Sequence, residues 1–256
     1  MIMRSIFFII LSSLLVSTNP NFSKDIKPQT NKISKVSAPI LSPTESLYRF
    51  MNLDSILNFE AFDKAMQGFN SVKTANKDIL TIIDFSLPST EKRMYVLDMK
   101  NKKLLFHTIV SHGRNSGEKY ATSFSNRHGS FQSSLGFYET KNTYQGGNGY
   151  SLVLDGLEKG INDQAKARAV VIHGADYASQ AVINSTGRLG RSYGCPALPR
   201  ELNRPIIDTI KNGSLLFIYA DNKEYLANSK IIKPLKERTL LAGSSLPSAV
   251  KEQRIL

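Results

Sequence analysis

Apolar runs of four to nine residues, separated by polar turns, predict a protein built mainly of β-strands. Residues 169–172 read Ala-Val-Val-Ile, a β-branched run that predicts a buried strand. Residues 93–98 and 103–111 are joined by Met-Lys-Asn-Lys, which predicts a hairpin. The other expected strands have the same character and lie at residues 79–86, 136–140, 151–157 and 214–220. We therefore expect a mainly β fold with flanking helices.

Helical spacing occurs on both sides of this region. Residues 44–51 and 54–71 are expected helices, and Asp54 is the expected N-cap of the second. The apolar residues of the second helix recur every three or four positions: Leu57, Ala61, Phe62, Ala65, Met66 and Phe69. Residues 200–211 predict a helix that ends at Gly213. We expect the leading helical segment, residues 44–75, to pack on the β domain.

The two ends of the chain differ from this pattern. At the N-terminus, Arg4 precedes about a dozen mostly apolar residues, which predicts a secretory signal peptide over residues 1–18. The run is shorter than the ~20 apolar residues of a transmembrane helix, so no stable membrane span is expected after cleavage. An uncleaved anchor remains the alternative. Residues 19–43 predict a flexible linker and residues 223–256 a C-terminal tail.

The chain has 256 residues and a formal net charge of +12, with 41% hydrophobic residues, enough for the core of one domain. The positive charge favours an anionic partner, such as nucleic acid, an anionic membrane or an anionic cell-wall polymer. The sequence has no Lys/Arg-rich block, RNA-binding motif or zinc-ligand spacing, so we expect no nucleic-acid partner. Solubility alone is the other explanation of the charge.

The candidate chemistry centres on Cys195, the only cysteine of the chain. An unpaired cysteine in an exported protein forms an intermolecular disulfide or remains a reactive thiol. A lone cysteine is more often buried and inert, but Cys195 lies in a polar turn, Ser-Tyr-Gly-Cys-Pro. His173 and Gly174 follow the strand at residues 169–172. The layout is that of a thiol nucleophile and its base, carried on loops beside a sheet.

Three further features surround this pair. The turn at Gly194 and Cys195 can aim two backbone N–H groups at one oxyanion. His112, in a polar loop, is a candidate second active-site histidine or substrate contact, although a solvated surface histidine explains it as well. Residues 144–150 are rich in glycine and predict a mobile loop that can serve as a lid.

The order His173-Gly174 and then Ser-Tyr-Gly-Cys195 resembles the motif of L,D-transpeptidases with the YkuD-type catalytic domain. Residues 187–199 read Gly-Arg-Leu-Gly-Arg-Ser-Tyr-Gly-Cys-Pro-Ala-Leu-Pro. This stretch is similar to the murein L,D-transpeptidase catalytic domain family. Weaker similarity extends the resemblance over about residues 80–220.

The resemblance implies a β-sandwich-type catalytic domain over residues 76–222. It also implies an exported enzyme of the periplasm or cell envelope that acts on peptidoglycan stem peptides and forms cross-links. By resemblance, Cys195 forms a thioester acyl-enzyme, His173 is the base, and the N–H groups near Gly194 hold the oxyanion. No metal or organic cofactor is implied, and carbapenems are expected to acylate the thiol.

Other functions remain open on the sequence. An L,D-carboxypeptidase would form the same acyl-enzyme and resolve it with water. A non-catalytic cell-wall-binding protein would keep the fold without the chemistry. A polyanion-binding module is suggested by the charge alone.

Two positions depart from the better-known pattern. Tyr193 stands where a histidine is usual, and Ala197 stands where an arginine usually follows the cysteine. An arginine that binds a substrate carboxylate must then come from elsewhere, and its forked guanidinium suits that role. The expected substrate-binding residues are Ser192, Tyr193, Arg191, Arg188, Gly174 and His112.

Overall fold

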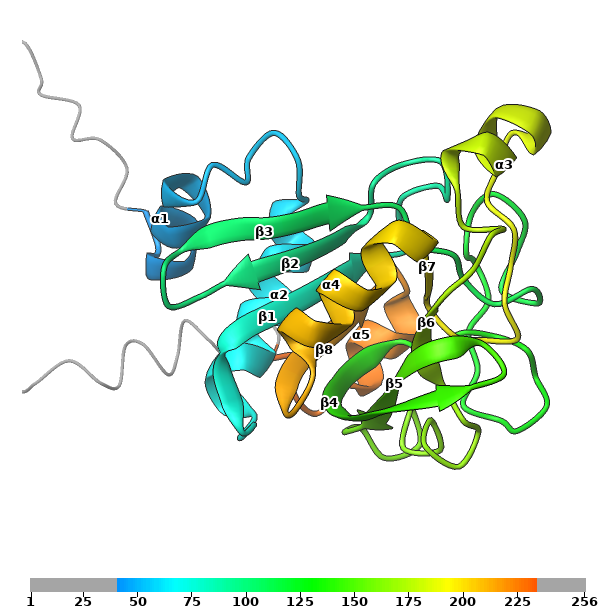
Figure 1. Cartoon of the computed structure of the whole chain (residues 1–256). Helices are drawn as coiled ribbons and strands as arrows, with labels where there is room; N and C mark the ends of the chain where they lie inside the picture. The colour runs from blue at the N-terminus through cyan, green and yellow to red at the C-terminus, as the bar shows by residue number, and fades with distance from the viewer. Residues whose placement is uncertain (1–40, 234–256) are drawn as a thin grey trace, which may run out of the picture. The chain divides into compact units, whose positions relative to one another are not determined.

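The computed structural model describes residues 41–233. The expected signal peptide, most of the expected linker and the end of the expected tail lie outside the described residues. Eight strands form one curled sheet in the order β3-β2-β1-β8-β4-β5-β6-β7 (Figure 1). The strands are β1 (Asn76–Asp84), β2 (Met94–Asp98), β3 (Lys103–Thr108), β4 (Gly136–Gly146), β5 (Gly149–Gly156), β6 (Val171–Gly174), β7 (Ala197–Leu198) and β8 (Ser214–Tyr219).

The expected mainly β class with flanking helices is confirmed. Most neighbouring strands are antiparallel, but β1 pairs with β8 in parallel and β6 pairs with β7 in parallel. Each of these parallel pairs joins strands that are separated by other elements in the sequence. The second pair matters for the site, because it brings two distant loops to one edge of the sheet.

The expected mobile loop over residues 144–150 is instead a hairpin, and its role as a lid stays a prediction. These residues extend the β4–β5 hairpin, in which Gly146 pairs with Gly149. Gly149 has φ of 79°, a conformation that favours glycine and that closes the two-residue turn. The strands continue beyond the apolar residues that predicted them, because polar residues on an exposed hairpin can still form the backbone ladder.

The helices are α1 (Pro43–Phe50), α2 (Phe59–Ser71), α3 (Gln180–Thr186), α4 (Arg200–Ile210) and α5 (Lys223–Asn228). The expected helix over 54–71 begins later than predicted, and its N-cap is Asn58, not Asp54. The Asn58 side chain accepts a hydrogen bond from the backbone N–H of Glu60 at 2.7 Å. Residues 51–57 form turns instead. The sequence did not predict α3 or α5.

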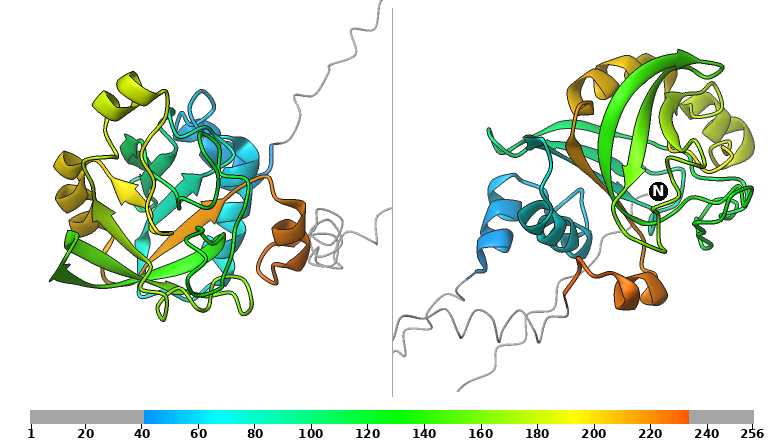
Figure 2. Two further views of the ribbon diagram at one scale, coloured as in Figure 1. Left: turned by 90° about the vertical axis from the view of Figure 1, so that its right-hand side faces the viewer. Right: turned by 90° about the horizontal axis from the view of Figure 1, so that it is seen from below.

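Helices cover both faces of the central strands. Figures 1 and 2 show α2 on one face of the sheet and α4 on the other. As a result β8 is buried along its whole length, which explains its continuous run of large apolar residues. Phe62 of α2 and Ile207 of α4 are both fully buried in the same core. The expected tail also contributes, since Tyr225 of α5 is buried and donates a hydrogen bond to Glu158.

The helix α2 approaches the sheet most closely at Gly68. A β-carbon placed there would lie 2.1 Å from the ring of Phe137, which stacks on Phe217 in the core. The absence of a side chain at this position therefore lets the helix lie directly on β4.

We predict that Gly68→Ala lowers the free energy of unfolding by about 1–3 kcal/mol, the range for overpacked cores. Alanine is the better helix former by about 1 kcal/mol, so the loss would report the contact with Phe137. Urea denaturation measures it, and Asn70→Ala, an exposed position of the same helix, is the control. A stabilised Gly68→Ala variant would contradict this packing.

Candidate active site

The parallel pairing of β6 with β7 brings the candidate histidine to the candidate cysteine. His173 is in register with Ala197, which lies two residues after Cys195. The backbone N–H of His173 donates to the carbonyl of Pro196 at 3.4 Å. On its other side, Ala197 forms a bridge with Ser111. The cysteine turn is thus attached to the sheet edge by the residues that immediately follow it.

Two hydroxyl groups hold the turn before Cys195, those of Ser192 and of Ser133, the second of which donates to the carbonyl of Gly194 at 3.2 Å. The Ser192 Oγ accepts from the backbone N–H of Gly194 at 3.0 Å and donates to the carbonyl of Cys195 at 2.6 Å. Gly194 has φ of 124°, and a β-carbon there would lie 2.8 Å from the carbonyl oxygen of Gln132. Glycine is therefore required at this position by both conformation and space.

The N–H of Gly194, an expected oxyanion donor, already has an acceptor. It donates to the Ser192 Oγ, so its role towards an oxyanion stays a prediction. Within residues 41–233, the Cys195 N–H has no hydrogen-bond partner, so it remains the available donor. The conformation of Gly194 also sets the shape of the turn.

The sulfur of Cys195 lies against the backbone that leads into β6. The Val171 N–H donates to Sγ at 3.4 Å, and the thiol faces the carbonyl of Ala169 at 3.7 Å. Ala169 has φ of 54°, an uncommon conformation for a residue with a β-carbon. The residue next to it, Arg168, carries a positive charge that acts on the sulfur.

Arg168 is fixed by four acceptors. Its guanidinium donates to the backbone carbonyls of Ser125 and Gln132 and to the hydroxyls of Ser130 and Ser134, at 2.6–3.3 Å. Burial raises the pKa of the Cys195 thiol, while the Val171 N–H and Arg168 lower it in part. The thiol, rather than a thiolate, is therefore the resting form.

His173 is oriented by its own chain. The ring Nδ1 lies 3.2 Å from the carbonyl of Gly174, so Nδ1 carries the proton and donates, and Nε2 is left as an acceptor. The residue is 4% exposed, and burial lowers the pKa of its imidazole. Among the described residues no hydrogen bond joins this ring to Cys195, and such contacts often form only with substrate. The ring has the protonation state of a general base.

One cavity of about 620 Å³ contains both groups. Cys195 and His173 line it together with Tyr177, Tyr193 and Asn148, the last from the turn between β4 and β5. Four arginines also line it: Arg114, Arg168, Arg188 and Arg191. Tyr193 is 68% exposed, and its ring lies 4.9 Å from that of Phe131. The cavity thus combines a nucleophile, a base, aromatic walls and a strong positive charge.

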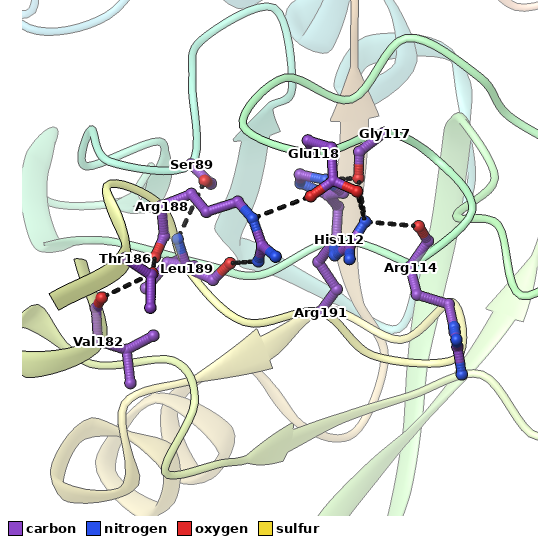
Figure 3. A network of polar contacts seen from close by, with 10 residues as sticks. All are labelled: Ser89, His112, Arg114, Gly117, Glu118, Val182, Thr186, Arg188, Leu189 and Arg191. Carbon is purple, nitrogen blue, oxygen red and sulfur yellow. Dashed lines mark hydrogen bonds and ion pairs between the residues drawn. The ribbon is translucent and has the colours of Figure 1, made fainter.

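Two of these arginines share one carboxylate (Figure 3). Glu118 forms ion pairs with Arg188 at 3.0 Å and with Arg191 at 2.7 Å. Arg191 also donates to the carbonyls of Arg114 and Gly117 at 3.0 and 3.1 Å. The arginines that the sequence assigned to a substrate carboxylate are therefore in the cavity, and each already has a protein partner.

The structure does not bring His112 to the cavity surface. It is 1% exposed, and its Nδ1 accepts from the buried Arg93 at 2.8 Å while Nε2 faces the carbonyl of Gly117 at 3.3 Å. Burial and the charge of Arg93 lower the pKa of His112 to about 4. Its carbonyl accepts from the Ser192 N–H at 3.0 Å. Instead of lining the cavity, His112 holds the cysteine turn through this hydrogen bond to Ser192.

Gly174 also differs from its expected role as a substrate contact. A β-carbon there would lie 3.0 Å from the side chain of Asn203 on α4, and its carbonyl orients His173. Within residues 41–233, no group of three or more His, Cys, Asp or Glu side chains is arranged to hold a metal ion. None of the helices in that range is long and apolar enough to cross a membrane.

The sequence model of the L,D-transpeptidase catalytic domain matches residues 53–219, well over half of the chain. The chain belongs to the L,D-transpeptidase catalytic domain family. The resemblance seen in the cysteine motif is thereby confirmed. The matched region contains the whole sheet and every cavity residue named above.

Solved structures of L,D-transpeptidases are distantly similar. One from Mycobacterium smegmatis is 13% identical with a TM-score of 0.37, over 56% of this chain and 59% of that chain. L,D-transpeptidase 3 from Mycobacterium tuberculosis is 11% identical with a TM-score of 0.35, over 56% of this chain and 61% of that chain. This L,D-transpeptidase family member therefore spans about three fifths of each. No significant match was found among curated proteins.

The expected site of this L,D-transpeptidase family member lacked five of the residues that line the cavity: Arg114, Asn148, Arg168, Ala169 and Tyr177. Arg168 directly precedes the expected strand, but nothing in the local pattern showed that it faces the sulfur. Arg114 lies in the loop after His112, and only the bridge between Gly113 and Ser192 places it at the cavity. Tyr177 packs on Gly190, and a β-carbon added at Gly190 would lie 2.3 Å from the Cβ of Tyr177.

We predict that alkylation of Cys195 by iodoacetamide is still accelerating at about pH 8.5, the ordinary pKa of a cysteine. Burial raises the pKa of this thiol, so the thiolate fraction is small at neutral pH. Arg168→Gln removes a nearby positive charge that lowers the pKa of the thiol, and it is expected to slow the reaction at pH 8. Arg204→Gln, an exposed arginine of α4, is the control. A rate that is constant above pH 7 would show a resting thiolate instead.

We also predict that His112 makes stability fall with acid. Its pKa is about 4 in the fold against an ordinary 6.5. Protonation therefore favours the unfolded chain, and about 3 kcal/mol is lost as the pH falls from 6.5 to 4. His112→Gln is expected to be less stable than wild type at pH 7, and the gap should narrow towards pH 4. Urea denaturation across this range measures it, with His128→Gln in an exposed loop as the control. A pH-independent gap would contradict the buried contact with Arg93.

Proposed function

We propose that this protein is an exported cysteine L,D-transpeptidase that cross-links peptidoglycan stem peptides through a thioester acyl-enzyme. The observation that carries the proposal is the shared cavity of Cys195 and His173. Membership of the L,D-transpeptidase catalytic domain family supports the same reaction class. The cysteine is free, as a thiol nucleophile must be.

The first half-reaction uses groups whose protonation states match their tasks. The neutral Nε2 of His173 takes the proton of the Cys195 thiol as Sγ bonds to the carbonyl carbon of the donor peptide. The bond from that carbon to the terminal D-residue then breaks. The leaving amine takes the proton from His173, and the acyl group remains on sulfur as a thioester.

The second half-reaction reverses the roles. An amine of a second stem peptide gives its proton to His173 and attacks the thioester carbon. The carbon–sulfur bond breaks, the proton returns to the thiol, and the new amide is the cross-link. Attack by water at the same stage gives an L,D-carboxypeptidase, so the acceptor alone separates the two reactions.

One backbone group is available to the oxyanion of both tetrahedral intermediates. The Cys195 N–H has no hydrogen-bond partner within residues 41–233, and it lies on the residue that attacks. The Gly194 N–H, the expected second donor of such a site, already donates to the Ser192 Oγ. The four arginines around the cavity add a positive field that favours a developing negative charge.

Export is part of the proposal because of the N-terminal sequence. Arg4 and the apolar residues after it fit a signal peptide, and the proposed substrate lies in the periplasm or cell envelope. The positive charge of the chain fits an anionic cell-wall polymer.

We predict that a carbapenem forms one covalent adduct with the purified protein, seen as a single mass increase of one drug molecule. Cys195→Ala should form no adduct, because the sulfur is the acylated atom. His173→Ala should form it about 10²–10⁴-fold more slowly, the range for loss of a general base. Intact-mass spectrometry at timed intervals measures all three.

An unmodified wild-type protein whose thiol is also inert to simple alkylating agents would favour a non-catalytic cell-wall-binding protein. Where the adduct forms, incubation with a donor tetrapeptide, with and without an acceptor amine, separates the two enzymes. A cross-linked product supports transfer, and hydrolysis that ignores the acceptor supports the carboxypeptidase.

A further inference from the structure

The cavity around Cys195 holds more positive charge than its own carboxylate neutralises. Four arginines line it, and the acidic side chain that pairs with any of them within residues 41–233 is Glu118 alone. One carboxylate balances one of four positive charges. A ligand that fills this cavity without negative charge of its own would therefore leave guanidinium groups partly desolvated and uncompensated.

Three of the arginines are committed to the protein. Arg168 donates four hydrogen bonds to the loop over residues 125–134. Arg188 and Arg191 hold Glu118 between them, and Arg191 further binds two backbone carbonyls. These groups shape the cavity and its field, and the guanidinium of each already has at least one protein acceptor.

Arg114 is different. Its backbone is fixed, since its N–H donates to the carbonyl of Ser192 at 2.7 Å and its carbonyl accepts from Arg191 at 3.0 Å. Its guanidinium carbon lies 5.7 Å from the centre of the Tyr193 ring. Figure 3 shows the side chain turned away from Glu118. Arg114 is an exposed residue, and within the described chain its guanidinium has no hydrogen-bond acceptor or acidic partner, so its donors are open to solvent or to a ligand.

We propose that Arg114 binds a carboxylate of the acyl-donor peptide other than that of the terminal D-residue, and that the enzyme thereby prefers donors with this carboxylate free over donors with it amidated. The proposal rests on the proposed function, because it assigns a ligand group to the same cavity. A guanidinium presents a planar pair of donors that matches the two oxygens of a carboxylate. A primary amide offers one oxygen and adds N–H groups that face the arginine.

The place of Arg114 makes this contact specific. Its backbone is bonded to Ser192, three residues before the nucleophile, and its side chain packs on Tyr193. A carboxylate held there would therefore fix the donor peptide relative to the sulfur. The aromatic ring restricts the guanidinium before the ligand arrives, so less conformational entropy is lost on binding.

The test measures binding without turnover, in the Cys195→Ala protein. The probes are a synthetic tetrapeptide that ends in a D-alanine carboxylate and carries one further carboxylate, and the same peptide with that second group converted to the amide. Isothermal titration gives both affinities at low and moderate salt. The matched variants are Arg114→Gln, Arg114→Lys and Arg204→Gln, the last an exposed arginine that also stacks on a tyrosine but lies outside the cavity.

We expect the diacid to bind about tenfold tighter than the amide, the size of one charge-assisted hydrogen-bonded contact. Arg114→Gln should bring the two affinities within about twofold, Arg114→Lys should keep part of the preference, and Arg204→Gln should keep all of it. A preference that survives in Arg114→Gln, or equal binding of both peptides by the parent protein, overturns the inference.

A second measurement, carbapenem acylation of Cys195, distinguishes failure of this inference from failure of the proposed function. If neither peptide binds, the assigned ligand class is wrong, while carbapenem acylation of Cys195 still decides whether the thiol is an activated acyl acceptor. If the thiol is not acylated but the diacid preference depends on Arg114, the cavity is a carboxylate-binding site without the proposed chemistry.

Discussion

The site depends on one short parallel pairing, that of β6 with β7. It sets His173 beside Ala197, two residues after Cys195, and so brings together a candidate base and a candidate nucleophile that lie far apart in the sequence. β7 has two residues, and a strand so short cannot hold its place through its own ladder. Additional bridges from Ser111 and Gly113 to the same stretch supply what β7 lacks. The loop after β3 is therefore a structural part of the active site, although it contributes no reacting atom.

The buried pair of Arg93 and His112 holds that loop in place. Arg93 is fully buried and donates to the carbonyls of Leu87 and Val110 as well as to the His112 ring. A guanidinium in this position needs hydrogen-bond acceptors and a nearby negative charge, because an unpaired buried charge is very costly. The fold supplies backbone oxygens, a neutral imidazole and the charge of the buried Asp84. In doing so it fixes the residue whose carbonyl holds Ser192.

The sequence named two groups that the structure brings to one cavity, and their catalytic roles stay a prediction. Cys195 lies in a polar turn and His173 follows a buried strand, and the resemblance to L,D-transpeptidases joined them into one candidate site. Local sequence did not show that a nearby hydroxyl, that of Ser192, accepts a hydrogen bond from the Gly194 N–H. Arg168 and Arg114 reach the cavity through loop contacts between distant segments, and hydrophobic periodicity carries no information about these. The helices α3 and α5 were missed for a related reason, since each is too short to show a period.

The electrostatics of the cavity reflect two opposing requirements. Cys195 is partly exposed, and desolvation of its sulfur raises the pKa of the thiol, which works against forming a thiolate. The charge of Arg168 opposes that effect, and the residue next to it in sequence, Ala169, faces the sulfur. Too much positive charge would in turn destabilise the loops that carry it, and Glu118 relieves the repulsion between Arg188 and Arg191. Arg114 has no acidic partner in the described chain, and it lines the cavity. The positive charge that the protein does not pair therefore lies where a ligand would bind.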